Sequence, residues 1–250
     1  MAIQILGIIP ARYASTRFPG KPLAEIAGKS LIERVYSQAR KAQKLHKLIV
    51  ATDDTRILAH VQAFGGQAVM TSLTHPSGTD RCAEVAEMFP EFEVCLNIQG
   101  DEPFINPTQI DLLASLFEKP DTQIATLIMP ITKAEDIFSE KEIKVVFNSR
   151  MQTLYMSRSP IPFLRDVPPE QWIHTHTFYK HIGLYGYRRE ILLQIAQLPP
   201  NELERCENLE QLRWLAHFPI QLAISHEETL SIDTPQDLEK ATEFLANKPS

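Results

Sequence analysis

The sequence predicts an α/β protein with a mostly parallel (mixed) sheet that is flanked by helices and carries a smaller β-rich insertion in its second half. Over the first half, apolar runs of strand length alternate with segments of helical periodicity, which is the rhythm of βαβ units. From residue 124 the rhythm changes to strand-like runs separated by proline-rich loops. No internal repeat or low-complexity linker divides the 250 residues, so we expect a single domain.

The first half is expected to begin with a buried strand at 3–9, because this run is almost continuously apolar. Ser30 and Glu33 form a capping box, which predicts a helix from there to about residue 41. Another helix is expected to follow Arg81 and to end near residue 88. The remaining elements expected in this half are strands at 48–52, 68–71 and 94–99 and a helix at 55–64.

Strand-like runs dominate the second half of the chain. Thr234 is a suitable N-cap and Pro235 a suitable first-turn residue, so a closing helix is expected from there to about residue 245. The strands expected in this half lie at 124–130, 143–147, 153–157, 178–187 and 230–232.

The composition argues against nucleic acid and membranes as partners. A net charge of −6 disfavours nucleic acid or an anionic membrane as the main partner. No segment approaches the ~20 apolar residues that span a bilayer, and the first residues lack the basic region of a signal peptide. The three cysteines show no paired spacing and fit a reducing compartment, so we expect a cytoplasmic protein.

A cationic loop directly follows the first strand. It carries Arg12, Arg17 and Lys21, and the small residues Ser15 and Thr16 lie between the arginines. Ligands of α/β sheets bind at the carboxyl ends of the strands, and fixed positive charges with accessible backbone N–H groups are what a polyphosphate requires. Because the chain is acidic elsewhere, this local cationic cluster is the first candidate binding site.

The common nucleotide motifs do not explain this loop. Gly28, Lys29 and Ser30 resemble the end of a P-loop, but Leu23 stands where that motif requires glycine. The G-x-G-x-x-G fingerprint of dinucleotide-binding proteins is also absent. A nucleotide would therefore bind by another arrangement.

Two aspartates are candidate metal ligands. Asp101 follows the strand expected at 94–99, and Asp233 follows the one at 230–232. Taken alone, each can be a turn residue. Taken together they suggest a Mg²⁺ site, because Mg²⁺ commonly uses one or two protein carboxylates and completes its shell with water or phosphate oxygens.

Two other polar clusters are weaker candidates for a functional site. His174 and His176 have no third ligand at helical spacing, so a solvated loop is the simpler interpretation. The acidic run that ends with Glu207 and Glu210 is typical of a solvated helical face, although these two side chains could also meet at one site.

In order and spacing, motifs along the whole chain resemble those of the 3-deoxy-manno-octulosonate (Kdo) cytidylyltransferase family. The matching blocks are 9–17, 51–53, 77–79, 97–103, 157–158, 181–188, 209–213 and 233–235. The resemblance implies a nucleotide-diphospho-sugar-transferase-like fold, a homodimer, a nucleotide-binding half (1–123) and a half for sugar binding and dimerisation (124–250). It also implies that CTP and Kdo react to CMP-Kdo and pyrophosphate in lipopolysaccharide biosynthesis, with Mg²⁺ as cofactor.

The resemblance assigns roles to individual residues. The implied catalytic residues are Arg12, Lys21, Asp101 and Asp233, of which the two aspartates would hold the metal. The implied nucleotide-binding residues are Pro10, Ala11, Arg12, Ser15, Thr16, Arg17, Lys21, Asp53, Ser77, Gly78 and Arg81. The implied sugar-binding residues are Gln99, Arg158, His181, Tyr185, Glu210 and Gln211.

Two of these assignments can be compared with what the residues indicate by themselves. Arg158 suits the sugar carboxylate, because its planar guanidinium binds carboxylates through two hydrogen bonds. His181 and Tyr185 alternate along a strand and so share one face, which without the resemblance would indicate core packing.

Alternatives remain open at this stage. The same chemistry could act on 8-amino-Kdo or on sialic acid, although sialic acid synthetases usually carry a more glycine-rich N-terminal loop. A sugar-1-phosphate nucleotidyltransferase would need a further cationic site for the sugar phosphate. A non-catalytic nucleotide-sensing protein would not need Lys21, Asp101 and Asp233, and all three are present.

Overall fold

The computed structural model describes residues 3–14 and 18–246, and within them the main sheet has nine strands. Seven strands follow one another in the order β11-β7-β10-β6-β1-β4-β5. Their bounds are β1 Ile5–Ala11, β4 Lys47–Thr52, β5 Ala68–Met70, β6 Val94–Asn97, β7 Ile124–Pro130, β10 Tyr179–Arg188 and β11 Ile220–Ile224. β1 pairs in parallel with β4 and β6, and the β4–β5 and β7–β11 pairs are also parallel, whereas β10 is antiparallel to both β6 and β7. The predicted mixed, mostly parallel sheet is confirmed.

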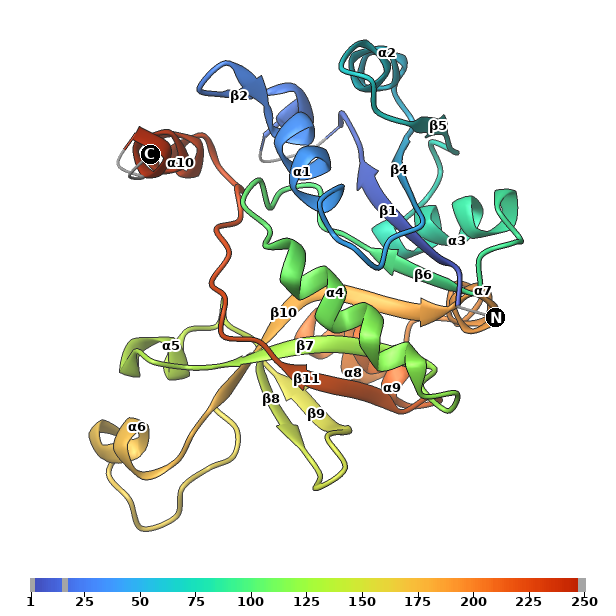
Figure 1. The fold of residues 1–250 in the computed structure, drawn as a ribbon. Helices are drawn as coiled ribbons and strands as arrows, with labels where there is room; N and C mark the ends of the chain where they lie inside the picture. The colour runs from blue at the N-terminus through green and yellow to red at the C-terminus, as the bar shows by residue number, and fades with distance from the viewer. Residues whose placement is uncertain (1–2, 15–17, 247–250) are drawn as a thin grey trace.

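Helices cover both faces of this sheet (Figure 1). α1, α2 and α4 contribute to one apolar core, while α3, α7 and α9 contribute to the other. Their bounds are α1 Leu31–Ala39, α2 Thr55–Ala63, α3 Gly78–Met88, α4 Pro107–Ser115, α7 Arg189–Ile195 and α9 Gln211–Leu215. Side chains alternate across a strand, so in β1 Ile5 and Ile9 enter the first core and Leu6 and Ile8 the second. Both cores also contain residues of β7 and β10, which joins the two halves of the chain.

The part of the second half that leaves the main sheet is small. Strands β8, Lys144–Phe147, and β9, Thr153–Ser157, form an antiparallel hairpin that meets β10 through the pairing of Lys144 with Lys180. Beyond it, short helices surround an aromatic cluster centred on Trp172 and Phe178, whose rings stack at 5.7 Å. These helices are α5 Ala134–Phe138, η3 Pro169–Gln171 and α6 Trp172–Thr175.

The end of the chain returns to the first half. After β11 an extended segment runs back along the molecule and places α10, Pro235–Ala246, beside β2, Glu25–Ile26 (Figure 1). Ile232 packs there in a small apolar cluster with Ile26 and Leu31. Asp233 is thereby carried from the second half to the edge of the sheet where β1 and β6 end.

Two predicted elements need correction. Residues 230–232 do not form a strand. The amide of Ile232 donates to the carbonyl of Asp101 at 2.8 Å, and its carbonyl accepts from the side chain of Lys21 and not from a neighbouring strand. α3 begins at Gly78 and not after Arg81, since the Ser77 hydroxyl accepts a hydrogen bond from the amide of Asp80 and caps the helix. α4 and β11 were not predicted. Among the described residues, no helix combines the length and apolar character needed to span a membrane.

Candidate active site

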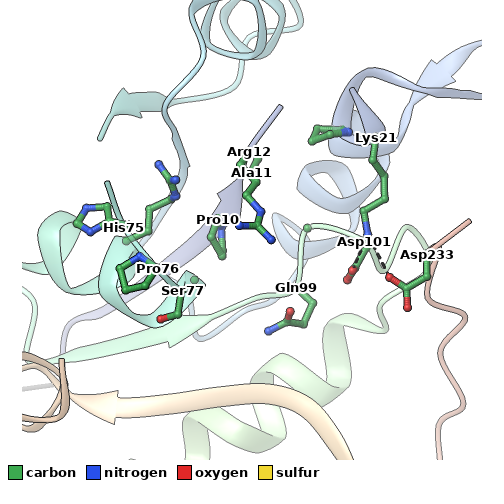
Figure 2. Close-up of a pocket in the computed structure, with 14 residues that line it drawn as sticks. Pro10, Ala11, Arg12, Lys21, His75, Pro76, Ser77, Gln99, Asp101 and Asp233 are labelled. Atoms are coloured by element: carbon green, nitrogen blue, oxygen red, sulfur yellow. Dashed lines mark hydrogen bonds and ion pairs between the residues drawn. The ribbon is translucent and has the colours of Figure 1, made fainter. Parts of the chain in front are cut away.

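A pocket of about 280 Å³ opens where the parallel strands β1 and β6 reach their carboxyl ends (Figure 2). This is the edge at which α/β sheets bind ligands. The lining residues are Pro10, Ala11, Arg12, Lys21, Pro22, His75, Pro76, Ser77, Gly78, Arg81, Gln99, Gly100, Asp101 and Asp233.

Gly100 lets the loop after β6 pass close to β1. A Cβ atom at this position would lie 2.7 Å from the carbonyl oxygen of Pro10, which is closer than such atoms approach. The missing side chain allows Gln99 and Asp101 to flank this contact and to face the pocket from the end of β6.

Lys21 lies between the two aspartates (Figure 2). Its ammonium is 2.9 Å from Oδ2 of Asp101 and 3.5 Å from Oδ1 of Asp233, and it donates to the carbonyl of Ile232 at 2.8 Å. One cation thus contacts two carboxylates that are far apart in the sequence. Arg12 lines the same pocket, so positive and negative side chains meet at this end of it.

The donor set fits a magnesium ion. Two carboxylates approach one position, and the described residues contain no cluster of three or more histidine, cysteine, aspartate or glutamate side chains arranged as metal ligands. Mg²⁺ prefers carboxylate oxygens and commonly takes one or two of them, completing its shell with water and substrate phosphates. Asp101 and Asp233 would be the residues that hold it.

Arg81 forms the base of the opposite wall. Its side chain is 4% exposed and pairs with Oδ2 of Asp53 at 2.7 Å, and it also donates to the hydroxyl of Thr71 and to the carbonyl of Ser72. Asp53 therefore lies behind the pocket and neutralises a buried charge, which would otherwise be costly.

His75 and Pro76 belong to the same wall and were not assigned to the site from the sequence. Glu84 fixes this wall, because its carboxylate accepts a hydrogen bond from the amide of Ser72 at 2.9 Å and contacts the ring of His75. Burial raises the pKa of Glu84, but these two contacts, together with the positive charge of Arg81, outweigh it and hold the pKa below its ordinary value. The sequence could have indicated both residues, because they directly precede Ser77, which was assigned to nucleotide binding.

Glu210 connects this wall to the second half. Its carboxylate accepts hydrogen bonds from the hydroxyl of Ser77 at 3.0 Å and from that of Thr79 at 2.9 Å. Arg213 lies 3.5 Å away. Burial raises the pKa of Glu210 above its usual range.

The expectation of a solvated helical face is therefore wrong for Glu207 and Glu210. α8, Glu202–Glu207, ends at Asn208, whose φ of 51° turns the chain before α9 begins. Glu207 accepts hydrogen bonds from the hydroxyl of Ser157 and from the amide of Arg158, so it does not share one solvated helical face with Glu210.

Arg158 lies beyond the pocket and binds main-chain carbonyls. Its guanidinium donates to Glu207 at 2.7 Å, to Glu140 at 2.8 Å and to Asn208 at 3.3 Å. Its own carbonyl accepts a hydrogen bond from the buried ammonium of Lys144. Desolvation lowers the pKa of Lys144.

His181 and Tyr185 share one face of β10, as predicted, with ring centroids 5.2 Å apart. Nε2 of His181 is buried without a hydrogen-bond partner among the described residues, and burial lowers the pKa of His181 to about 4. Burial also raises the pKa of Tyr185. Gln99 connects the pocket to this strand, since its side chain donates to the carbonyl of Gly183 at 2.9 Å, within the bulge of β10.

Comparison with known proteins places this geometry in a family. A family model described as cytidylyltransferase matches residues 6–224. The chain belongs to the cytidylyltransferase family. A 3-deoxy-manno-octulosonate cytidylyltransferase of Bacteroides thetaiotaomicron is 54% identical, with 98% of this chain and 100% of that protein covered. One of Thermodesulfovibrio yellowstonii is 44% identical, with 95% and 96% covered.

Solved structures agree with this assignment. The structure of a CMP:2-keto-3-deoxy-manno-octonic acid synthetase complexed with CTP has a TM-score of 0.90 and 41% identity, with 97% of this chain and 98% of that chain covered. A 4-diphosphocytidyl-2C-methyl-D-erythritol synthase from Anaerococcus prevotii, at 13% identity and a TM-score of 0.62, shares the fold. The predicted family and the predicted class of enzyme, a nucleotidyltransferase, are confirmed.

The cytidylyltransferase pocket unites most, but not all, of the predicted site residues. Those that line it are Pro10, Ala11, Arg12, Lys21, Ser77, Gly78, Arg81, Gln99, Asp101 and Asp233. Those that lie behind or beyond it are Asp53, Arg158, His181, Tyr185, Glu210 and Gln211, which is buried at the start of α9. Ser15, Thr16 and Arg17 lie outside the described residues.

Proposed function

We propose that this cytidylyltransferase transfers CMP from CTP to the anomeric hydroxyl of Kdo, giving CMP-Kdo and pyrophosphate. The observation that carries the proposal is the convergence of Asp101 and Asp233 on Lys21, beside Arg12, in one pocket at the end of β1 and β6. The relatives that match this chain over nearly their whole length carry the name of this reaction.

The chemistry requires positioning and charge neutralisation. The sugar oxygen forms a bond to the α-phosphorus, the bond between the α-phosphorus and the bridging oxygen breaks, and the hydroxyl proton is lost. Arg12 and Lys21, together with Ser15, Thr16 and Arg17 of the same loop, would hold the triphosphate and offset the charge on the departing pyrophosphate. A bound Mg²⁺ would supply further charge neutralisation at the phosphate and lower the pKa of the sugar hydroxyl.

The nucleoside would lie against the wall formed by the end of β1 and the start of α3. Pro10, Ala11, Ser77 and Gly78 face the pocket there, and the pair of Arg81 with Asp53 supports the wall from behind. All of these residues belong to the first half of the chain, 1–123, which is the nucleotide-binding half in this proposal.

The sugar would bind toward the second half, 124–250. Gln99 connects the nucleotide pocket with the second half, since it lines the pocket and its side chain donates a hydrogen bond to β10. Arg158 would bind the sugar carboxylate after exchanging its main-chain carbonyl partners for that anion. His181, Tyr185, Glu210 and Gln211 would supply the polar groups that a polyol needs.

The wider setting is also part of the proposal. We expect a homodimer, as the resemblance to the family implies. Leu154, 60% exposed, and Phe163, 75% exposed, are side chains of the second half that such an interface could cover. A CTP-dependent reaction on a sugar acid fits a cytoplasmic enzyme of lipopolysaccharide biosynthesis.

Pyrophosphate release with CTP and Mg²⁺ tests the function. The wild-type protein is assayed with Kdo, 8-amino-Kdo and N-acetylneuraminate at equal concentrations. Release that is fastest with Kdo supports the proposal. Release only with another sugar would reject Kdo while preserving the chemistry, and binding of CTP without release from any sugar would indicate a nucleotide sensor.

A further inference from the structure

Lys21 uses its whole hydrogen-bonding capacity inside the candidate metal site. An ammonium has three donors and no acceptor. In this chain its contacts are Asp101, Asp233 and the carbonyl of Ile232. The side chain is only 16% exposed, compared with 28% for Asp101 and 42% for Asp233. The ammonium therefore already balances charge at the point where the two carboxylates approach each other.

The backbone of Lys21 is held in place, whereas its side chain is long and rotatable. It begins η1, Lys21–Leu23, directly after Gly20. The φ of Gly20 is 72°, and a Cβ atom there would lie 3.2 Å from the Tyr13 ring, so both features favour glycine. The amide of Gly20 donates to the carbonyl of Tyr13 at 2.9 Å, and Pro22 is buried. Movement of the ammonium therefore requires rotation of its four-carbon stem and no movement of the loop.

The two aspartates are held together independently of Lys21. The amide of Ile232 donates to the carbonyl of Asp101 at 2.8 Å, and Ile232 is fully buried in the cluster that anchors α10. The amides of Asp233 and Thr234 both donate to the carboxylate of Asp237. Replacing the ammonium would therefore leave two carboxylates near each other with less positive charge between them.

A divalent cation and the ammonium compete for this position. Mg²⁺ binds carboxylate oxygens at about 2.0–2.1 Å, which would bring it against an ammonium that is 2.9 Å from Asp101. Two cations at such separations repel strongly in a partly desolvated site. The phosphates of a nucleotide offer the ammonium another anion within the same pocket, which Lys21 also lines.

We infer that Lys21 is an internal counter-ion that opposes metal binding by Asp101 and Asp233 until nucleotide phosphates draw its ammonium away. The inference rests on the proposed metal site of the enzyme. It makes metal binding and nucleotide binding mutually reinforcing, because each favours the same position of Lys21 and such coupling is reciprocal. The metal then enters the site together with the nucleotide.

Mn²⁺ titration of the nucleotide-free protein, followed by the EPR signal of free Mn²⁺, tests this. We expect Lys21→Met to bind Mn²⁺ at least about tenfold more tightly than the wild type, within the usual range of coupling between sites. Arg12→Met is the matched control, because it removes a positive charge from the same pocket but Arg12 has no ion pair or hydrogen bond among the described residues. We expect its affinity to stay within about threefold of the wild type.

Three results would overturn the inference, two from the single variants and one from a double variant. One is an unchanged affinity in Lys21→Met, with Lys21→Gln as a second variant in case the first does not fold. The other is an equal gain in Lys21→Met and Arg12→Met, which would indicate a general field effect. The double variant Lys21→Met/Asp101→Asn should lose the gain, and retention of the gain would place the ion elsewhere. Wild-type turnover with CTP and Kdo is measured separately, so failure of the inference is distinguishable from failure of the proposed function.

Discussion

The carboxylate of Glu210 accepts a 3.0 Å hydrogen bond from the hydroxyl of Ser77, 133 residues earlier in the chain. Ser77 caps α3 and lines the nucleotide pocket, while Glu210 precedes α9 in the second half. The second oxygen of Glu210 accepts from Thr79. This carboxylate, whose side chain is 26% exposed, thus connects the nucleotide wall with the side of the site where the sugar is proposed to bind.

Replacement of Glu210 should weaken both substrates. Glu210→Ala removes the carboxylate acceptor of the Thr79 hydroxyl and one of the two carboxylate acceptors of the Ser77 hydroxyl, the other being Asp80 at 2.5 Å. We expect the KM for CTP and for Kdo each to rise roughly tenfold. Glu210→Gln keeps an accepting oxygen and should recover part of the loss. Steady-state kinetics of both variants, with the exposed Glu202→Ala as control, measures this. An effect confined to Kdo would contradict the connection.

Asp101→Ala should remove turnover and leave the fold intact. The side chain of Asp101 is 28% exposed and lines the pocket, so its loss creates no core cavity. We expect kcat to fall by roughly three orders of magnitude, as for loss of a principal electrostatic group. Pyrophosphate release measures turnover and circular dichroism checks folding. Normal turnover in a folded variant would reject the metal assignment.

Lys144 should stabilise the sugar side of the molecule. It is fully buried, and its ammonium donates to the carbonyls of Ser139, Glu142 and Arg158. Lys144→Met would leave these carbonyls without that partner, which should cost about 3 kcal/mol in the free energy of unfolding. Urea denaturation measures the change, with the exposed Lys141→Met as control. Two variants of equal stability would show that the buried ammonium contributes nothing.

His181 should make the protein sensitive to acid. Its pKa is lowered by burial to about 4, from an ordinary value of 6.5, so the fold favours the neutral ring. The stability that the neutral ring contributes is fully present above pH 6.5 and is lost progressively as the pH falls from 6.5 through 4, because the unfolded chain binds the proton first. The loss should reach about 2–3 kcal/mol by pH 4.5.

Unfolding of His181→Gln between pH 7 and pH 4.5 measures this contribution. The variant should lose less stability than the wild type over this range. The exposed His174→Gln is the control and should follow the wild type. Parallel pH profiles for all three proteins would contradict the buried, neutral state of His181.

Much of the fold could be predicted from local pattern. The expected strand at 124–130 matches β7, and Ser30 caps α1 by accepting a hydrogen bond from Glu33. The run at 220–224 was missed because a short apolar segment does not distinguish strand from helix. The expected strand at 230–232 failed because three apolar residues do not reveal whether a strand edge is available to pair with them.

The candidate site was predictable as a set of residues but not as an arrangement. Position at strand ends and charge pointed to Arg12, Lys21 and Asp101. No local pattern could place the ammonium of Lys21 between two aspartates, since that depends on the return of the chain after β11. The partners of Glu210 were equally hidden, because the turn at Asn208 removes Glu210 from the helical face that its spacing suggested.

Phosphorus-31 NMR of the wild-type protein with CTP, Kdo and Mg²⁺ tests the central claim most directly. The account predicts that each CTP consumed gives one CMP-sugar phosphodiester and one pyrophosphate, and that neither forms when Kdo is omitted. Hydrolysis of CTP to inorganic phosphate, or an unchanged CTP spectrum in the presence of Kdo, would contradict it.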